Sequence, residues 1–141
     1  MITQDFYLPK YDWHVRVYYA VTTYWRDRIL RDLRRIGCRG TEWLRAKRSL
    51  TDGSLNTGLT YSNFAKGETV MVISLTSSPA EFLNSWMHEM RHLSRHIEQA
   101  RGLSPYGEPA AYLEGTIGQK MFPVAKGFIC EHCSGKLKER L

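Results

Sequence analysis

Alternating apolar and polar positions near the start of the chain predict a strand. In residues 12–22, large apolar side chains occupy every second position from Trp13 to Tyr19, which is typical of a strand with one buried face. Residues 68–76 form a nearly continuous apolar run of strand length, which predicts a second, more deeply buried strand. The short segment 56–63 precedes that run across a tight turn, so the two segments together predict a β-hairpin.

Four segments carry the apolar spacing of helices. Residues 23–36, in which arginines separate the apolar positions, and residues 42–50 predict two short helices. The longest pattern runs over residues 79–101 and opens on a Ser-Pro-Ala-Glu capping box at 78–81. A further helix is predicted over residues 108–121, after a turn.

These elements predict an α+β fold, in which a small sheet of about three strands packs against long helices. The length of 141 residues predicts a single domain over residues 1–141, with a loosely ordered tail from about residue 134 to the end. The chain has no apolar run of about 18 residues, so we expect no transmembrane helix and no membrane partner.

The excess positive charge is concentrated in one segment. The formal net charge is +6, and the segment that begins at Arg26 and ends at Arg48 has nine Lys or Arg and three Asp or Glu, a local net charge of +6. The rest of the chain is balanced. Such a segment either attracts nucleic acid or an acidic partner, or is an ordinary solvated helix face.

Cysteine usage favours a reducing compartment. The chain has three cysteines, Cys38, Cys130 and Cys133. An odd and low count is unusual for a secreted protein. The first residues also lack the basic and apolar regions of a signal peptide. We therefore expect a cytoplasmic location.

The candidate chemistry lies in the longest predicted helix. His88-Glu89-Met90-Arg91-His92 matches H-E-x-x-H, the zinc-peptidase signature. Residues four apart lie on one face of a helix, so the imidazoles of His88 and His92 can reach one metal ion. Glu89 leaves the helix in another direction, so its carboxylate can take the proton of a metal-bound water.

A catalytic zinc site usually has three protein ligands, so the motif needs a third. His96 is about 12 Å along the helix from His88, which is too far for both to bind one ion. The pair Cys130 and Cys133 either binds metal or is a reduced surface pair. Glu108 is the best candidate, because its helix follows a tight turn and can return alongside the first helix.

The residues around Glu108 also carry a resemblance to a known family. Glu108, Ala111 and Tyr112 form E-x-x-A-Y. Together with H-E-x-x-H, this pattern resembles the gluzincin branch of zinc metallopeptidases, in which a downstream glutamate completes a His-His-Glu site. Segments 56–63 and 107–113 are also similar to small zinc-peptidase-like proteins of Bacteroides-type gut bacteria and their phages. The resemblance implies a minimal zincin-like core, although Tyr112 stands where gluzincins have an aspartate that orients a zinc histidine.

The motif and the resemblance lead to one main hypothesis, a gluzincin-like zinc metallopeptidase. In it, His88, His92 and Glu108 bind Zn²⁺, Glu89 is the general base, and a peptide or protein substrate pairs with the strand at 68–76. The alternative is a catalytically inactive, zinc-stabilised binding module that acts on nucleic acid or an acidic protein through the basic segment.

Overall fold

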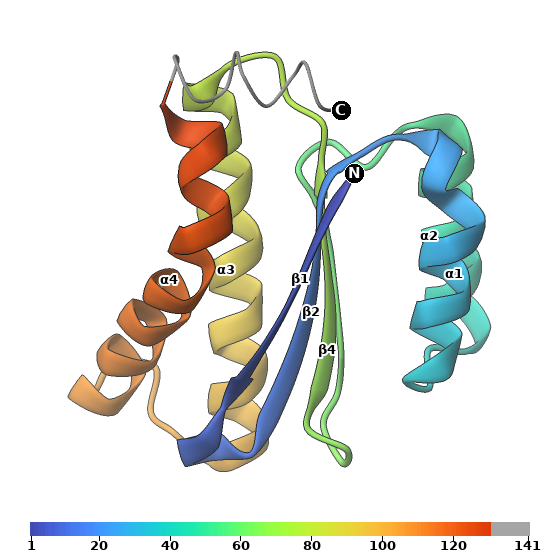
Figure 1. Ribbon diagram of the computed structural model, residues 1–141. Coiled ribbons are helices and arrows are strands. Elements are labelled where there is room, and N and C mark those ends of the chain that lie inside the picture. Colours follow the sequence, from blue (N-terminus) through green and yellow to red (C-terminus); the bar gives the residue numbers. More distant parts are fainter. Residues whose placement is uncertain (131–141) are drawn as a thin grey trace.

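The structure is a computed structural model that describes residues 1–130. A four-stranded sheet separates two pairs of helices, α1 with α2 and α3 with α4 (Figure 1). The strands are β1 (Ile2–Leu8), β2 (Trp13–Val21), β3 (Gly58–Asn63) and β4 (Glu68–Ser74). The helices are α1 (Arg26–Arg35), α2 (Gly40–Asp52), α3 (Pro79–Arg101) and α4 (Glu108–Ile129), with 3-10 turns at Pro9–Tyr11 and Thr23–Trp25. The predicted α+β fold is confirmed, with four strands instead of about three.

The strands follow the order β1-β2-β4-β3 across the sheet. β1 and β2 are antiparallel, β3 and β4 form the predicted hairpin, and β2 and β4 are parallel. The chain passes over one face of the sheet through α1 and α2 to make the parallel pairing possible. Because β4 lies inside the sheet, the prediction that an extended substrate pairs with it is wrong; β3 is the edge strand on that side.

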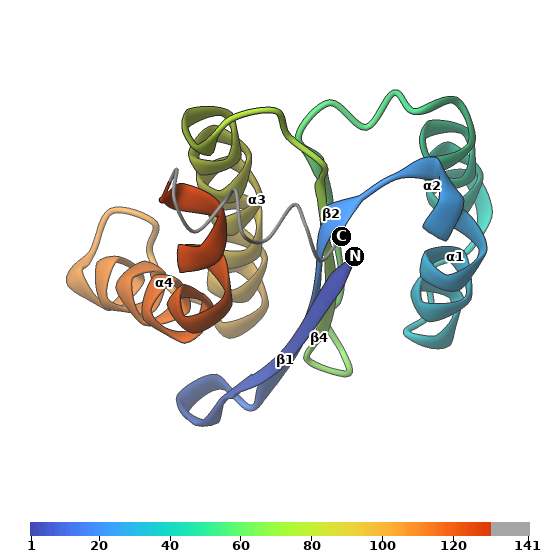
Figure 2. The ribbon, with the colours of Figure 1, turned by 45° about the horizontal axis from the view of Figure 1, so that its top comes forward.

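Helices cover both faces of the sheet (Figure 2). Side chains of the central strands alternate between two cores, one on each face. Val17 and Tyr19 of β2 pack with α3 and α4, whereas Tyr18 between them packs with α1. In β4, Met71 belongs to the first core and its neighbour Val72 to the second. A strand buried on both faces has the continuous apolar sequence from which β4 was predicted.

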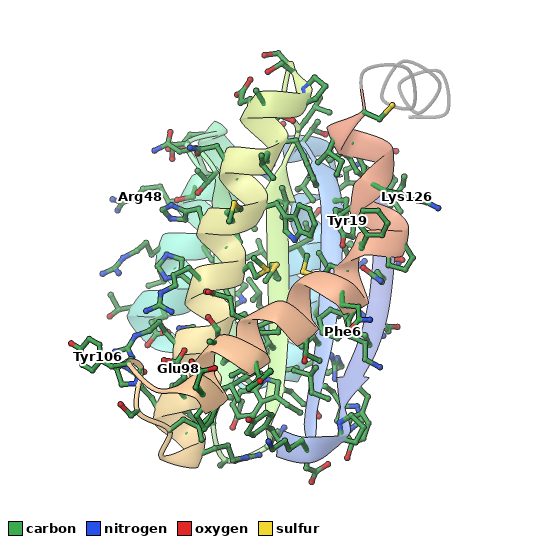
Figure 3. All side chains as sticks on the ribbon, turned by 90° about the vertical axis from the view of Figure 1, so that its left-hand side faces the viewer. Phe6, Tyr19, Arg48, Glu98, Tyr106 and Lys126 are labelled. Carbon is green, nitrogen blue, oxygen red and sulfur yellow. The ribbon has the colours of Figure 1, made fainter. Side chains whose placement is uncertain are left out.

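The helix pair α3 and α4 buries a wide apolar stripe against the sheet. Phe82, Trp86, Met90, Leu93 and Ile97 form the buried face of α3, at the predicted positions. In Figure 3, Phe6 and Tyr19 lie beside α4, and the ring centroid of Tyr19 is 5.5 Å from that of Phe128. Each large apolar side chain buried in this way stabilises the fold by about 1.5–3 kcal/mol.

Two elements exceed the prediction from the sequence. β1 was not predicted, and α4 continues past Pro123 to Ile129 instead of ending near Met121. Figure 1 shows that α4 bends along its length, which is expected of a helix that contains proline. None of the helices in residues 1–130 is long and apolar enough to cross a membrane. The predicted tail at 134–141 lies outside the described residues.

Candidate functional site

The H-E-x-x-H motif lies in the middle of α3, as predicted. The helix begins at the predicted capping box, where the Ser78 hydroxyl accepts a hydrogen bond from the backbone N–H of Glu81 at 3.1 Å. The imidazoles of His88 and His92, called the histidine pair below, are exposed, and their Nε2 atoms are 3.2 Å apart. At this distance one ring donates a hydrogen bond to the other.

Glu89 is buried between α3 and β3, and only 1% of its surface is exposed. Its Oε2 accepts a hydrogen bond from the hydroxyl of Thr57, and its Oε1 accepts one from the hydroxyl of Thr60, both at 2.9 Å. A buried carboxylate needs such donors because they replace the water that it loses on folding. Glu89 therefore ties the longest helix to the edge strand of the sheet.

A glycine at the start of β3 sets the position of these two threonines. Gly58 has a φ of +152°, and a Cβ on it would lie 1.9 Å from the backbone oxygen of Val72 on β4. Only glycine allows two backbones to approach so closely. The close approach holds Thr57 and Thr60 against α3. Gly58 thereby places the two hydroxyl groups that donate to the buried Glu89.

The predicted third ligand, Glu108, does not reach the histidine pair. Glu114 of α4 contacts Ser94 at 3.3 Å and Arg91 at 3.5 Å on α3. Glu108 precedes Glu114 by six residues, so it lies about 9 Å farther along α4, toward the end of α3. Each residue rotates a helix by about 100°, so His88 and His92 point to a different side of α3 from Arg91 and Ser94, which face Glu114.

Within residues 1–130, no three His, Cys, Asp or Glu side chains are grouped so that they could hold a metal ion. The predicted His88-His92-Glu108 zinc site is therefore wrong. Both hypotheses that depend on this site, the zinc-dependent hydrolase and the zinc-stabilised binding module, are therefore contradicted as well. The histidine pair supplies two of the three protein ligands that a catalytic zinc site usually has. Catalytic activity as such and zinc as a cofactor stay predictions.

His96 lies one turn of α3 beyond His92 and belongs to a chain of hydrogen bonds that crosses β3, β4 and β2. Its Nδ1 lies 2.7 Å from the hydroxyl of Ser62, which lies 2.7 Å from the hydroxyl of Thr69. The indole N–H of Trp13 donates to Thr69 at 2.8 Å. Burial lowers the pKa of His96, and the nearby charge of His92 lowers it further. These contacts give His96 a structural role at the seam between α3 and β3.

A second carboxylate of α3 is buried where α3 meets α4, near the turn that carries Tyr106 (Figure 3). Glu98 accepts a hydrogen bond from Arg95 at 3.3 Å and pairs with Arg91 at 3.8 Å. Its Oε2 accepts no hydrogen bond from the described residues. The helix spacing of Arg95 and Glu98 is visible in the sequence. The burial of Glu98 depends on how α4 packs on α3, so it could not be predicted from local sequence.

Two of the three cysteines, Cys38 and Cys130, lie within the described residues. Cys38 is buried in the core beneath α1 and α2, and this burial raises the pKa of its thiol. Cys130 directly follows α4, and its predicted partner Cys133 lies outside the described residues. The prediction of a cysteine pair, as a metal site or as reduced thiols, stays a prediction.

The basic segment forms the outer layer of α1 and α2. Eight of its cationic side chains are exposed, and we call them the basic layer: Arg28, Arg31, Arg34, Arg35, Arg39, Arg45, Lys47 and Arg48. Of its three carboxylates, Asp27 and Glu42 are exposed and Asp32 is buried. The exposed surface of this layer is therefore strongly positive.

Aromatic rings lie among these cations. The guanidinium carbon of Arg34 is 4.1 Å from the ring centroid of Trp43, and the ammonium of Lys47 is 5.5 Å from the same centroid. Tyr24, just before α1, is 82% exposed. Cation–π contacts of this kind hold the long side chains in place along the surface.

Comparison with known proteins gives no relative. No protein-family model matches the chain, and neither a curated protein nor a solved structure matches it. The gluzincin resemblance stays a prediction.

Proposed function

We propose that this protein binds nucleic acid through the basic layer. The observation that supports the proposal is the excess of exposed cations in residues 26–48, eight against two exposed carboxylates. Nucleic acids carry closely spaced phosphates with condensed counterions, and a basic surface gains free energy by releasing those ions. The two adjacent helices α1 and α2 carry most of these cations on one surface, so the protein can contact several phosphates at once.

The aromatic rings in this layer favour nucleic acid over an acidic protein. Tyr24 offers an exposed ring on which a base or sugar can pack, and the guanidinium of Arg34 lies over the ring of Trp43. Arginine outnumbers lysine in the basic layer, and its planar guanidinium binds phosphate in a bidentate manner. An acidic protein would use the charges but would leave the rings without a specific partner.

The test is the salt dependence of binding to a labelled oligonucleotide of about 12 nucleotides, measured by fluorescence anisotropy. Affinity is expected to fall steeply between about 50 mM and 200 mM salt. Replacing Arg31, Arg45 and Arg48 together with glutamine removes three exposed charges and is expected to weaken binding at least about tenfold. The slope of log K against log salt should become shallower by up to about three.

A matched control removes the same charge from the rest of the surface. Glutamine at Lys10, Lys120 and Lys126, all exposed and outside α1 and α2, is expected to change affinity far less. Equal losses in the two triple variants would show unspecific attraction to a basic protein and would overturn the proposal. So would the absence of binding to DNA and RNA at 50 mM salt.

A further inference from the structure

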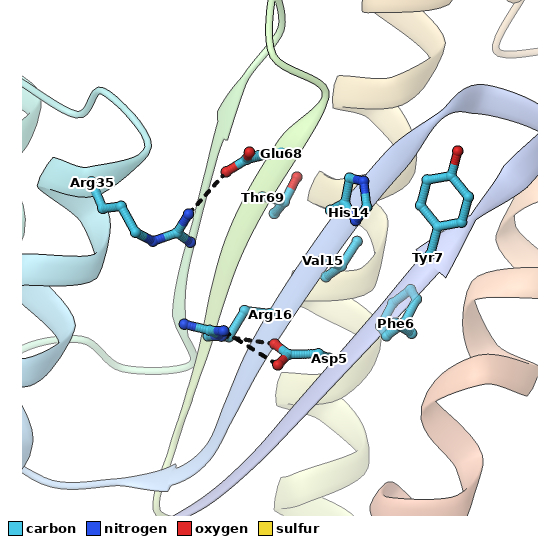
Figure 4. Close-up of a pocket in the computed structure, with 9 residues that line it drawn as sticks. All are labelled: Asp5, Phe6, Tyr7, His14, Val15, Arg16, Arg35, Glu68 and Thr69. Atoms are coloured by element: carbon cyan, nitrogen blue, oxygen red, sulfur yellow. Dashed lines mark hydrogen bonds and ion pairs between the residues drawn. The ribbon is translucent and has the colours of Figure 1, made fainter.

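An open cleft of about 530 Å³ lies on the face of the sheet that carries α1, beside the end of that helix (Figure 4). Its volume is within the range of small-molecule sites. Three strands and one helix line it, and their lining residues include Asp5 and Tyr7 of β1, His14 and Arg16 of β2, Glu68 of β4 and Arg35 of α1. None of these residues belongs to the H-E-x-x-H motif.

Two aromatic rings form one wall of the cleft. The antiparallel register pairs Tyr7 with His14, and their ring centroids are 4.5 Å apart. The Tyr7 hydroxyl donates a hydrogen bond to Asp12 at 2.7 Å, which fixes the orientation of its ring. Both side chains are exposed, so a planar ring can stack on them.

Two guanidinium groups lie on the other side of the cleft (Figure 4). Arg16 is held by Asp5 at 2.7 Å, and Arg35 is held by Glu68 at 3.2 Å. Both also pair with the buried Asp32, at 3.5 Å and 2.6 Å. These ion pairs fix the two guanidiniums in place. The hydrogen bonds of Arg35 to described residues use Nε and Nη1, so the N–H groups of Nη2 can donate to a phosphate.

The carboxylates of the cleft add acceptors. Each oxygen of Asp5 and Glu68 has two acceptor positions, and the ion pairs above use only part of this capacity. Exocyclic amino groups of bases and the hydroxyls of a sugar are donors of the matching kind. The cleft therefore combines a stacking wall, a phosphate donor and acceptors for polar ring substituents.

We propose that this cleft binds one nucleotide unit, with the base stacked on Tyr7 and His14 and the phosphate bound by Arg35. A base inside a duplex cannot enter such a cleft, whereas an unstacked base of a single strand can. Where the nucleotide belongs to a strand, the inference rests on the proposed function. It then specifies the substrate class as single-stranded nucleic acid.

The basic layer continues the cleft along α1. Arg28, Arg31 and Arg35 recur at helix spacing, so they lie along one side of α1. Arg28 reaches to 5.9 Å from the ring centroid of Tyr18 on β2, which places this row beside the sheet. The phosphates of a strand can follow the row while one base enters the cleft.

The experiment compares three probes on the full chain: a single-stranded oligonucleotide of about 12 nucleotides, the duplex of the same sequence, and the four free nucleoside monophosphates. We expect the single strand to bind more tightly than the duplex. His14→Ala should weaken binding of the single strand at least about fivefold, because it removes a stacking ring. His14→Phe keeps an aromatic ring and should retain the affinity. Tyr106→Ala, a 97% exposed ring on the α3–α4 turn, is the control that should have no effect.

Each outcome separates the cleft from the proposed function. Salt-sensitive binding that is equal for single strand and duplex, and unchanged in His14→Ala, supports the basic layer and overturns the cleft. Binding of free monophosphates that His14→Ala weakens, without binding of either oligonucleotide, supports the cleft and overturns the proposed function. If no probe binds, both are overturned. Thermal unfolding followed by circular dichroism checks that His14→Ala is folded.

Discussion

The two faces of the sheet are covered by helices of very different length, and this difference decides where polar groups meet solvent. α3 and α4 have 23 and 22 residues, about 34 Å of helix each, which is longer than the strands they cross. α1 has 10 residues, about 15 Å, whereas β2 with 9 residues is about 30 Å long. The short helix leaves part of its face of the sheet uncovered, and the cleft lies there.

The comparison also explains why the most conspicuous motif does not make the most open site. On the α3 face, Glu89 and Glu98 are buried, and each is held by neighbouring donors. On the α1 face, Arg35 and Glu68 pair with each other at the rim of an open cleft. A buried motif residue such as Glu89 stabilises the packing of α3, whereas charged residues beside a short helix can reach a ligand.

The largest expected effect tests whether the two faces form one cooperative unit. Leu93 of α3 and Leu33 of α1 are both fully buried, one in each core. Each change to alanine should lower the free energy of unfolding by about 2–5 kcal/mol in urea denaturation. Because β2 and β4 contribute to both cores, both variants should unfold in a single transition.

Leu44→Ala, at a position that is 61% exposed on α2, is the control and should change stability by less than about 0.5 kcal/mol. A two-step unfolding curve, with Leu33→Ala shifting only one step, would show that the α1 and α2 layer unfolds independently of the rest.

The next effect concerns the buried carboxylate. Glu89→Ala leaves the hydroxyls of Thr57 and Thr60 without their acceptor and should destabilise the protein by about 2–3 kcal/mol. Glu89→Gln keeps one amide oxygen as acceptor and should cost about 1 kcal/mol. The exposed Glu42, changed to alanine, provides the comparison in the same urea assay. If Glu89→Ala were as stable as the wild type, the carboxylate would not anchor β3 to α3.

Local signals in the sequence predicted most of the fold. The capping box and the apolar spacing placed α3 at its observed bounds, and the apolar run placed β4. β1 was not predicted because one of its faces is polar at Thr3 and Asp5. The apolar residues of its other face are recognised as core residues only once α4 packs beside them. The end of α4 was missed because Pro123 reads as a stop signal, whereas the burial of Ala125 and Phe128 stabilises the helix beyond it.

The candidate site was less predictable, because it depends on long-range contacts. Helix spacing correctly brought His88 and His92 together, but the place of Glu108 depends on the register in which α4 packs on α3. Likewise, the cleft joins Asp5 to Arg35, thirty residues apart, through the order of strands in the sheet. The concentration of charge in residues 26–48 was visible, whereas the cleft beside it was not.

A smaller effect is expected from pH at the seam of α3 and β3. The pKa of His96 is lowered from its ordinary value of 6.5 by burial and by His92, so the unfolded chain takes up a proton more readily than the folded protein. Its contribution to stability is present above about pH 6.5 and is lost as the pH falls through the lower folded pKa. The wild type should therefore lose more stability than His96→Gln between pH 7.5 and 5, measured from urea midpoints.

The exposed, non-titrating Gln99 on the same helix, changed to alanine, should reproduce the wild-type pH profile. Parallel profiles for the wild type and His96→Gln would contradict a histidine that is kept neutral by its surroundings.

The smallest effect is expected at Glu108, the residue that the sequence predicts as the third zinc ligand and that the structure places away from the histidine pair. Because α4 packs with Glu114 beside Ser94, Glu108 lies about 9 Å beyond that contact and away from the histidine pair. Glu108→Ala should therefore leave both the stability, measured by urea denaturation, and the zinc content after dialysis, measured by elemental analysis, unchanged.

His92→Ala is the matched variant, since it removes half of the histidine pair without touching α4. A zinc ion that the wild type retains and that Glu108→Ala loses would require α4 to pack in another register. The closed α3 face would then hold the reactive site, and the contrast with the open α1 face would be reversed.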